Sequence, residues 1–191
     1  MGMAEPDATF HTADMVRALI DEERAWPRYE TLYGELVVTP SPRIPHQEIA
    51  GELFGELRAY LQRERIGKAF TAPADISWGR TDVLVQPDVF VVPIDDARAA
   101  RAADDWAVIR HLLLAVEILS PSTARRDRFA KRRLYQQQGV PLYWVLDADD
   151  RSAAVWTPEA ELPQVERERL VWHPAGASTS FTVALAALYD A

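Results

Sequence analysis

The sequence contains no cysteine, which excludes disulfides, zinc–thiolate sites and a thiol nucleophile. It has no apolar run near the roughly 18 residues of a membrane-spanning helix, and its start, MGMAEPDATF, lacks a signal-peptide pattern. It also has no G-x-S-x-G elbow, P-loop, G-x-G-x-x-G or His-Glu-x-x-His motif. We therefore expect a cytoplasmic protein with no membrane partner and no organic cofactor, outside the common serine hydrolase, nucleotide-binding and zincin classes.

Positive charge is scarce in the chain as a whole. Lys and Arg number 21 against 29 Asp and Glu, a formal net charge of −8. Coating nucleic acid non-specifically requires clustered cations, so the total charge argues against that role. Cations gather in one run, at Arg125, Arg126, Arg128, Lys131, Arg132 and Arg133. This strip could contact a phosphate backbone, or it could be an ordinary solvated helix face.

Hydrophobic residues make up 48% of the 191 positions, enough for the core of one domain. Periodicity and turn residues predict helices over about 12–23 and 46–65, a hairpin over 28–39, and strands over 69–78 and 83–92. Residues 95–109 should form a loop or short helix, and short strands are expected near 153–156, 169–173 and 179–183. We predict one mixed α/β domain over 1–191, with a helical extension (1–27), a core (28–157) and a small C-terminal β region (158–191).

The most informative stretch runs from Leu112 to Asp147. Its near-continuous apolar start predicts a strand buried on both faces of a sheet. Ser120-Pro121-Ser122-Thr123 supplies residues typical of a helix start, and Gly139 is typical of a helix end. A second apolar strand follows, so the stretch predicts a βαβ crossover unit in a mixed or parallel sheet.

Two acids interrupt these apolar strands. Glu117 lies inside the strand that opens the crossover unit, and Asp88 follows Pro87, a residue that often marks an edge or bulge within strands. If the strands are neighbours, the two carboxylates converge, which is the arrangement that Mg²⁺ prefers and that can activate water against a phosphoryl group. The alternative is that Asp88 caps a turn and Glu117 pairs with an arginine.

Four other residues are candidates for the same site. Lys131 could orient the attacking water or neutralise phosphate charge, although its spacing from Asp127 also suits a surface ion pair. His46, at the start of the second predicted helix, could reach the site or simply cap the helix. Glu52, on the same helix, could add a metal contact or be an ordinary solvated residue. Ser120 and its neighbours could present helix-start amide groups to an anion.

A resemblance to a known family rests on an ordered set of motifs over about residues 28–157. These are Glu35-Leu36-Val37-Val38-Thr39-Pro40-Ser41-Pro42, His46, Gln86-Pro87-Asp88, Val116-Glu117-Ile118-Leu119-Ser120-Pro121-Ser122-Thr123, Asp127, Lys131, Tyr135, Gly139-Val140 and Tyr143-Trp144. Together they resemble the bacterial Uma-type putative restriction endonuclease family, a branch of the PD-(D/E)XK nuclease-like superfamily.

The resemblance implies a restriction endonuclease-like fold, with a mixed central β-sheet flanked by α-helices, and a metal-dependent site that hydrolyses DNA to 5′-phosphate and 3′-hydroxyl ends. Asp88 and Glu117 match the two acids that hold Mg²⁺, with Mn²⁺ as a substitute. The superfamily expects lysine two residues after Glu117, where this chain has Leu119. Lys131, on the following helix, would replace that lysine.

Three functions therefore compete. The first is a Mg²⁺-dependent endodeoxyribonuclease with Asp88, Glu117 and Lys131 as catalytic residues, acting as a homodimer, with DNA-backbone contacts from Arg125, Arg126, Arg128 and Arg132. The second is a catalytically inactive binding or regulatory module of the same fold, which the negative charge and Leu119 favour. The third is a metal-dependent hydrolase of a small phosphoester.

Overall fold

The computed structural model describes residues 9–20, 26–120 and 124–190. Its main sheet has the strand order β3-β5-β6-β7-β8-β9. The strands are β3 (Gly67–Thr71), β5 (Val89–Pro93), β6 (Leu114–Ile118), β7 (Tyr143–Asp147), β8 (Ser152–Trp156) and β9 (Gln164–Glu166). The β6–β7 pair is parallel and the other pairs are antiparallel, so the sheet is mixed and contains the expected crossover.

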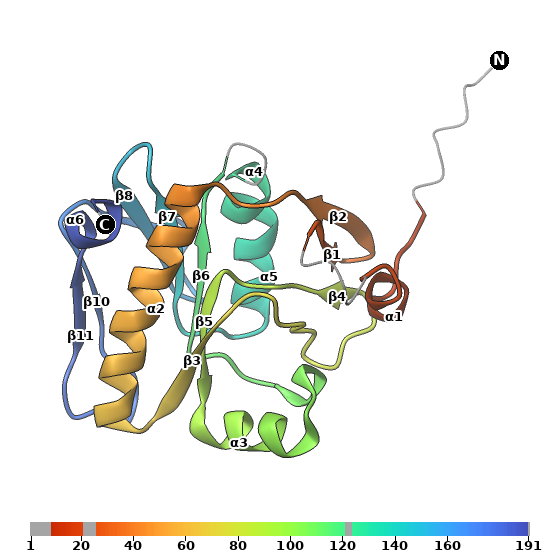
Figure 1. Cartoon of the computed structure of the whole chain (residues 1–191), viewed down its shortest axis with the longest axis horizontal. Coiled ribbons are helices and arrows are strands. Elements are labelled where there is room, and N and C mark those ends of the chain that lie inside the picture. Colours follow the sequence, from red (N-terminus) through yellow and green to blue (C-terminus); the bar gives the residue numbers. More distant parts are fainter. Residues whose placement is uncertain (1–8, 21–25, 121–123, 191) are drawn as a thin grey trace.

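Helices cover both faces of this sheet (Figure 1). One face packs against the long helix α2 (Ile44–Glu64), and the other against a helical segment made of α4 (Ala124–Arg126), a π-helical turn η2 (Asp127–Lys131) and α5 (Arg132–Gln137). Helix α3 (Ile94–Ala103) and the 3₁₀ turn η1 (Trp106–Val108) also lie on the α5 side.

Alternation along the central strands divides the core in two. Val89 and Val91 of β5 point to the α2 side, whereas Phe90 and Val92 point to the α5 side. Successive strand side chains face opposite ways, so a strand covered on both faces is apolar at every position. This explains the near-continuous apolar runs, and it means that a charged residue in such a strand is buried whichever way it points.

Two small sheets flank the main one. The first has the order β2-β1-β4, formed by β1 (Arg28–Leu32), β2 (Glu35–Thr39) and β4 (Val83–Leu84), with the short helix α1 (Ala13–Arg17) beside it. The second is the C-terminal hairpin of β10 (Arg169–Trp172) and β11 (Phe181–Ala184), followed by helix α6 (Leu185–Tyr189). The hairpin packs against α2 and completes the core on that side.

The mixed α/β fold with flanking helices is confirmed, but some boundaries were wrong. Residues 83–92 do not form one strand, because the chain leaves the small sheet after β4 and enters the main sheet at β5. Pro87, which has no N–H to donate, lies at this transition. Strand β3 ends at Thr71 instead of continuing to residue 78, and β9 was not predicted. Helix α1 ends at Arg17, while residues 21–23 of its predicted range lie outside the described residues.

Within the described parts of the chain, no helix has both the length and the apolar character needed to cross a membrane.

Candidate active site

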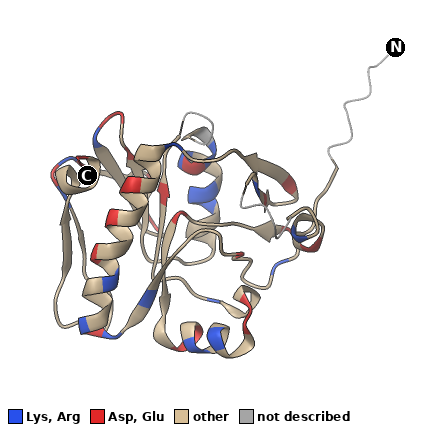
Figure 2. Cartoon of the chain, in the orientation of Figure 1, with Lys and Arg blue, Asp and Glu red and all other residues tan. Residues whose placement is uncertain are grey.

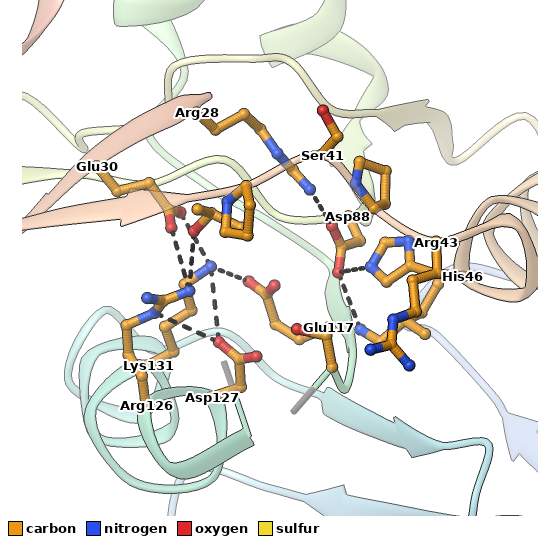
Figure 3. Close-up of a pocket in the computed structure, with 15 residues that line it drawn as sticks. Arg28, Glu30, Ser41, Arg43, His46, Asp88, Glu117, Arg126, Asp127 and Lys131 are labelled. Atoms are coloured by element: carbon orange, nitrogen blue, oxygen red, sulfur yellow. Dashed lines mark hydrogen bonds and ion pairs between the residues drawn. The ribbon is translucent and has the colours of Figure 1, made fainter. Parts of the chain in front are cut away.

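Asp88 and Glu117 lie opposite each other at one end of the β5–β6 pair. The antiparallel register pairs Val89 with Val116, so the next position along each strand places Asp88 against Glu117. Both side chains enter the same cavity on the α5 side, as Figure 3 shows, and both are buried, with 6% and 2% of their surface exposed. The condition that the sequence left open, that these strands are neighbours, is therefore met.

Asp88 is held by donors from three elements. Arg28 Nη2 on β1 donates to Oδ1 over 2.8 Å, and the backbone N–H of Ile118 donates to Oδ2 over 2.9 Å. His46 Nε2, at the start of α2, lies 3.1 Å from Oδ2. Burial alone would raise the pKa of Asp88, but the His46 hydrogen bond and the charges of His46 and Arg28 hold it below its ordinary value. Asp88 is thus kept as a carboxylate.

Glu117 is bound to the helical segment on its face of the sheet. Lys131 Nζ and the Tyr135 hydroxyl both donate to Oε1, over 2.8 and 2.9 Å. Burial raises the pKa of Glu117 well above its ordinary value; Lys131 opposes this, while Asp88, Asp127 and Glu30 add to it. Of the two facing acids, Glu117 is therefore the one that more readily takes up a proton.

Lys131 stands among three carboxylates. Its Nζ is 2.9 Å from Glu30 Oε1, 2.8 Å from Glu117 Oε1 and 3.9 Å from Asp127 Oδ1. Burial lowers the pKa of a lysine, but these three acids outweigh burial and the pKa of Lys131 is raised. The side chain thus stays an ammonium ion and is 2% exposed, so it serves as a fixed positive charge.

The π-helical turn η2 begins at Asp127 and ends at Lys131, and both of these charged residues are buried. Such turns are rare and frequently occur at functional sites. The Tyr143 hydroxyl of β7 donates to the backbone carbonyl of Asp127 over 2.8 Å and ties the turn to the sheet. The two residues therefore reach the cavity together from a helix whose other buried residues, such as Leu134, belong to the apolar core.

Sequence reasoning did not single out Arg28 and Glu30 of β1. Glu30 Oε1 also accepts the backbone N–H of Gln86, so it connects β1 both to the turn before Asp88 and to Lys131. Both residues lie in the strand-like run RYETL, where they are buried. The argument applied to Glu117, that a charge in a buried strand needs a partner, would have drawn attention to them. Which partner they have depends on the tertiary structure.

The cavity has a volume of about 270 Å³ and a balanced set of charged groups. Its lining includes four acids and four always-charged bases: Glu30, Asp88, Glu117 and Asp127, with Arg28, Arg43, Arg126 and Lys131. Arg126 Nη2 donates to Thr39 Oγ1 and lies 3.9 Å from Glu30 Oε2. Ser120 and the exposed Arg43 also line the cavity, so an anion could enter beside the acids.

The other candidate residues lie at varying distances from the cavity. Glu52 is exposed on α2 and does not line it. Arg128 is exposed and pairs with Asp147 over 2.5 Å. Arg132 turns away, with its guanidinium 4.8 Å from the centre of the Trp156 ring. The side chain of Arg125, and the predicted helix-start residues 121–123, lie outside the described residues.

The oxygen atoms present fit a metal held by two carboxylates. Asp88 Oδ1 accepts one hydrogen bond, and Glu117 Oε2 accepts none from the described residues, so both keep free lone pairs. Among those residues, no three acid or histidine side chains converge on one point as a metal cage. A donor set of two acids suits Mg²⁺, which keeps several waters and takes further oxygens from substrate phosphate.

The mixed sheet with helices on both faces has the restriction endonuclease-like fold, and the cavity with two facing acids lies at one end of its central strands. The sequence matches the model of the family described as "Uma2: Putative restriction endonuclease" over residues 12–186. The chain therefore belongs to the Uma2 family.

The chain was also compared with solved structures and with curated protein sequences. A crystal structure described as "a putative nuclease belonging to DUF820 from Anabaena variabilis ATCC 29413" superposes with a TM-score of 0.74. The match is 24% identical in sequence and covers 94% of this chain and 97% of that chain, so it establishes the shared fold. No curated protein sequence matches this one.

Proposed function

We propose that the protein is a metal-dependent endonuclease that hydrolyses DNA phosphodiester bonds. The observation that carries the proposal is the opposition of Asp88 and Glu117 across β5–β6, with Lys131 Nζ 2.8 Å from Glu117. Membership of a family described as restriction endonuclease supports DNA as the substrate.

Asp88 Oδ1 and Glu117 Oε2 are the atoms that would hold Mg²⁺, or Mn²⁺ in its place. When bound, the ion supplies polarisation of a phosphoryl oxygen and activation of water at neutral pH. The excess of acids around Lys131 favours cation binding, because Glu117, Glu30 and Asp127 together carry more negative charge than Lys131 and Arg126 balance.

The chain's own cations would handle the substrate. Lys131 cannot act as a general base because its raised pKa keeps it protonated, so its role is to neutralise charge that develops on the phosphate. Arg126 and Arg43 line the same cavity and are placed to contact the flanking phosphates. Cleavage of both strands of a duplex calls for two sites, and we propose that two copies of the chain supply them. Sedimentation showing only monomer at micromolar concentration would refute the dimer.

A non-catalytic nuclease-fold module is the second candidate. It is favoured by the internal pairing of the site, in which Arg28 and Lys131 already neutralise Asp88 and Glu117. Leu119, at the usual lysine position, packs against the apolar core on the α5 side. Metal binding separates the two candidates, because a binding module with a self-neutralised site has no need of a cation there.

The test is incubation of the purified protein with supercoiled plasmid and with single-stranded DNA, in Mg²⁺, Mn²⁺ or EDTA. Asp88→Asn and Glu117→Gln, each shown by circular dichroism to be folded, run beside the wild type. Nicking that requires metal and disappears in both variants is expected. Calorimetric titration of Mg²⁺ and Mn²⁺ completes the test. No cleavage together with no metal binding would leave the non-catalytic module as the answer.

A further inference from the structure

Strand β3 is the open edge of the main sheet. It pairs with β5, and no described strand pairs with its other side. The strand starts beyond the last turn of α2, whereas His46 lies in the first turn, and the strand ends at Thr71, which pairs with Val89 next to Asp88. Between His46 and Arg65 the helix rises by roughly 28 Å, so the start of the edge is remote from the active site. The two cavities that flank the edge share no lining residue with the cavity of Asp88 and Glu117.

The ladder shows which backbone groups of β3 are unpaired. The N–H of Ala72 donates to Asp88 O, and the N–H of Ile94 donates to Ile66 O. Antiparallel pairs alternate between bonded and non-bonded positions, so Lys68 and Phe70 direct their N–H and C=O groups toward β5. Gly67, Ala69 and Thr71 direct theirs away from the sheet. These three alternate residues present unpaired N–H and C=O groups along the edge, which is a template for another strand.

A cavity lies on each side of this edge. The cavity on the α2 side has a volume of about 460 Å³ and an apolar floor of Phe54 and Leu61. The cavity on the α3 side has a volume of about 320 Å³, with Phe70 and Trp106 among its lining residues. Lys68 borders both. A strand added to β3 would send alternate side chains into the two cavities, because successive residues of a strand face opposite ways.

The charge of the edge selects the partner. Arg58, Arg65, Lys68 and Arg98 line the α2-side cavity, and no acid lines it. Arg98 pairs with Asp95, whereas Arg58, Arg65 and Lys68 form no ion pair with any described residue. Figure 2 shows Lys and Arg on the lower part of α2, on β3 and on α3, although the chain has a net charge of −8.

The α3-side cavity differs in character. Its basic residues are Lys68 and Arg101, and it also has two acids, Asp104 and Asp105. Acidic side chains are therefore favoured only on the α2 side, and apolar side chains on the side of Phe70 and Trp106. A second copy of this chain is a poor occupant, because pairing β3 with β3 would bring two sets of the same cations together.

We propose that the β3 edge is a docking site for an extended segment of another protein in which acidic and apolar residues alternate. The segment would pair its backbone with Gly67, Ala69 and Thr71. It would place acids beside Arg58 and Arg65 on the α2 side and apolar side chains against Phe70 and Trp106, with Lys68 at the border of both cavities. This is strand addition, in which main-chain hydrogen bonds supply affinity and pockets for alternate side chains supply specificity. It does not depend on the nuclease proposal.

The test uses the full-length protein and a fluorescent peptide, acetyl-Glu-Val-Glu-Val-Glu-Val-Glu-amide, followed by anisotropy. Binding is expected, with slower hydrogen exchange at the amides of Gly67, Ala69 and Thr71. The same peptide with Lys in place of Glu should not bind. Lys68→Glu should weaken binding by at least about tenfold, and Arg169→Glu, an exposed position on the distant strand β10, should not change it.

Ala69→Pro tests the backbone contact. It removes an outward-facing N–H, a change that an edge strand tolerates, and should abolish binding while the protein stays folded by circular dichroism. If that variant unfolds, Arg58→Glu, which is exposed on α2, carries the test with Lys68→Glu. No peptide binding, or binding that leaves exchange at 67–71 unchanged, would overturn the proposal. So would binding of a 20-base-pair duplex that Lys68→Glu weakens and Ala69→Pro leaves intact, which would identify a nucleic-acid surface instead.

Discussion

Asp88 and Glu117 face each other across one antiparallel strand pair, yet their surroundings move their pKa values in opposite directions. Asp88 accepts from Arg28, His46 and a backbone N–H, which keep its pKa low despite burial. Glu117 is buried and shares its single ammonium partner with Glu30 and Asp127, so its pKa is high. Two acids whose environments separate their pKa values in this way are typical of catalytic sites.

This difference predicts unequal costs of neutralising the two acids. Asp88→Asn leaves the buried guanidinium of Arg28 without its charged partner, and should lower the free energy of unfolding by about 3 kcal/mol. Glu117→Gln leaves Lys131 paired with Glu30, and should cost about 1 kcal/mol. Urea denaturation at pH 7 measures both values. A loss for Glu117→Gln equal to that for Asp88→Asn would contradict this account of the pairing.

Lys131 should contribute to catalysis as a fixed charge. Lys131→Ala should lower the kcat for plasmid nicking by about 100-fold, the scale of one lost electrostatic contact to a transition state. Arg133→Ala is the matched control, since Arg133 is exposed on the same helical segment. Initial rates at saturating plasmid are the measurement. An unchanged rate in Lys131→Ala would assign the lysine to structure alone.

Leu119 offers a test of the displaced lysine. Its side chain alternates onto the same sheet face as that of Glu117. It lines a second cavity, which shares Ile118 and Ser120 with the candidate active site. In a Lys131→Ala background, Leu119→Lys should recover about tenfold in nicking rate by returning a positive charge to the acids. Leu119→Met in the same background is the control for packing. Equal rates for the two double variants would show that position 119 cannot replace Lys131.

Glu30 should position Lys131 from β1. Glu30→Gln keeps an oxygen that can accept the Gln86 N–H but removes the charge 2.9 Å from Lys131 Nζ. We expect a loss of about tenfold in kcat and a change in unfolding free energy of about 1 kcal/mol or less. Glu35→Gln, exposed on the neighbouring strand β2, is the matched control. Complete unfolding of Glu30→Gln would mean that the charge is needed for the fold.

Glu64 should make stability depend on pH at the other end of α2. Its carboxylate accepts from the side chains of Thr179 and Ser178 and from the Ser178 N–H, and these bonds lower its pKa from 4.5 to about 2. Because the folded pKa is the lower one, the stabilisation is fully present above pH 4.5 and is lost as the pH falls toward 2. Thermal melts should show Glu64→Gln less stable than wild type at pH 6 and approaching it near pH 2.5. Glu56→Gln, exposed on the same helix, is the control. A deficit independent of pH would contradict this explanation.

The sequence alone was enough for the features that depend on local pattern. The strand–helix–strand order of the crossover unit follows from apolar periodicity, and Gly139 lies just after the last helical residues with a φ of +66°. Asp88 and Glu117 could be selected because a charge within an apolar strand is costly unless it has a partner. Each of these signals is local, because it can be recognised from a residue and its near neighbours along the chain.

The tertiary structure decided everything that depends on register and on which distant segments meet. Only the β5–β6 pairing places Asp88 opposite Glu117, and only the small β2-β1-β4 sheet brings Arg28 and Glu30 into the same cavity, although Arg28 lies 60 positions before Asp88 in the sequence. Likewise Lys131 and Arg132 are adjacent in one basic run, yet the first is buried among three acids and the second contacts Trp156. The physical reason is that long-range contacts, and the direction in which each helical residue points, determine which groups each charge faces. Neither can be deduced from the spacing of residues along the chain alone.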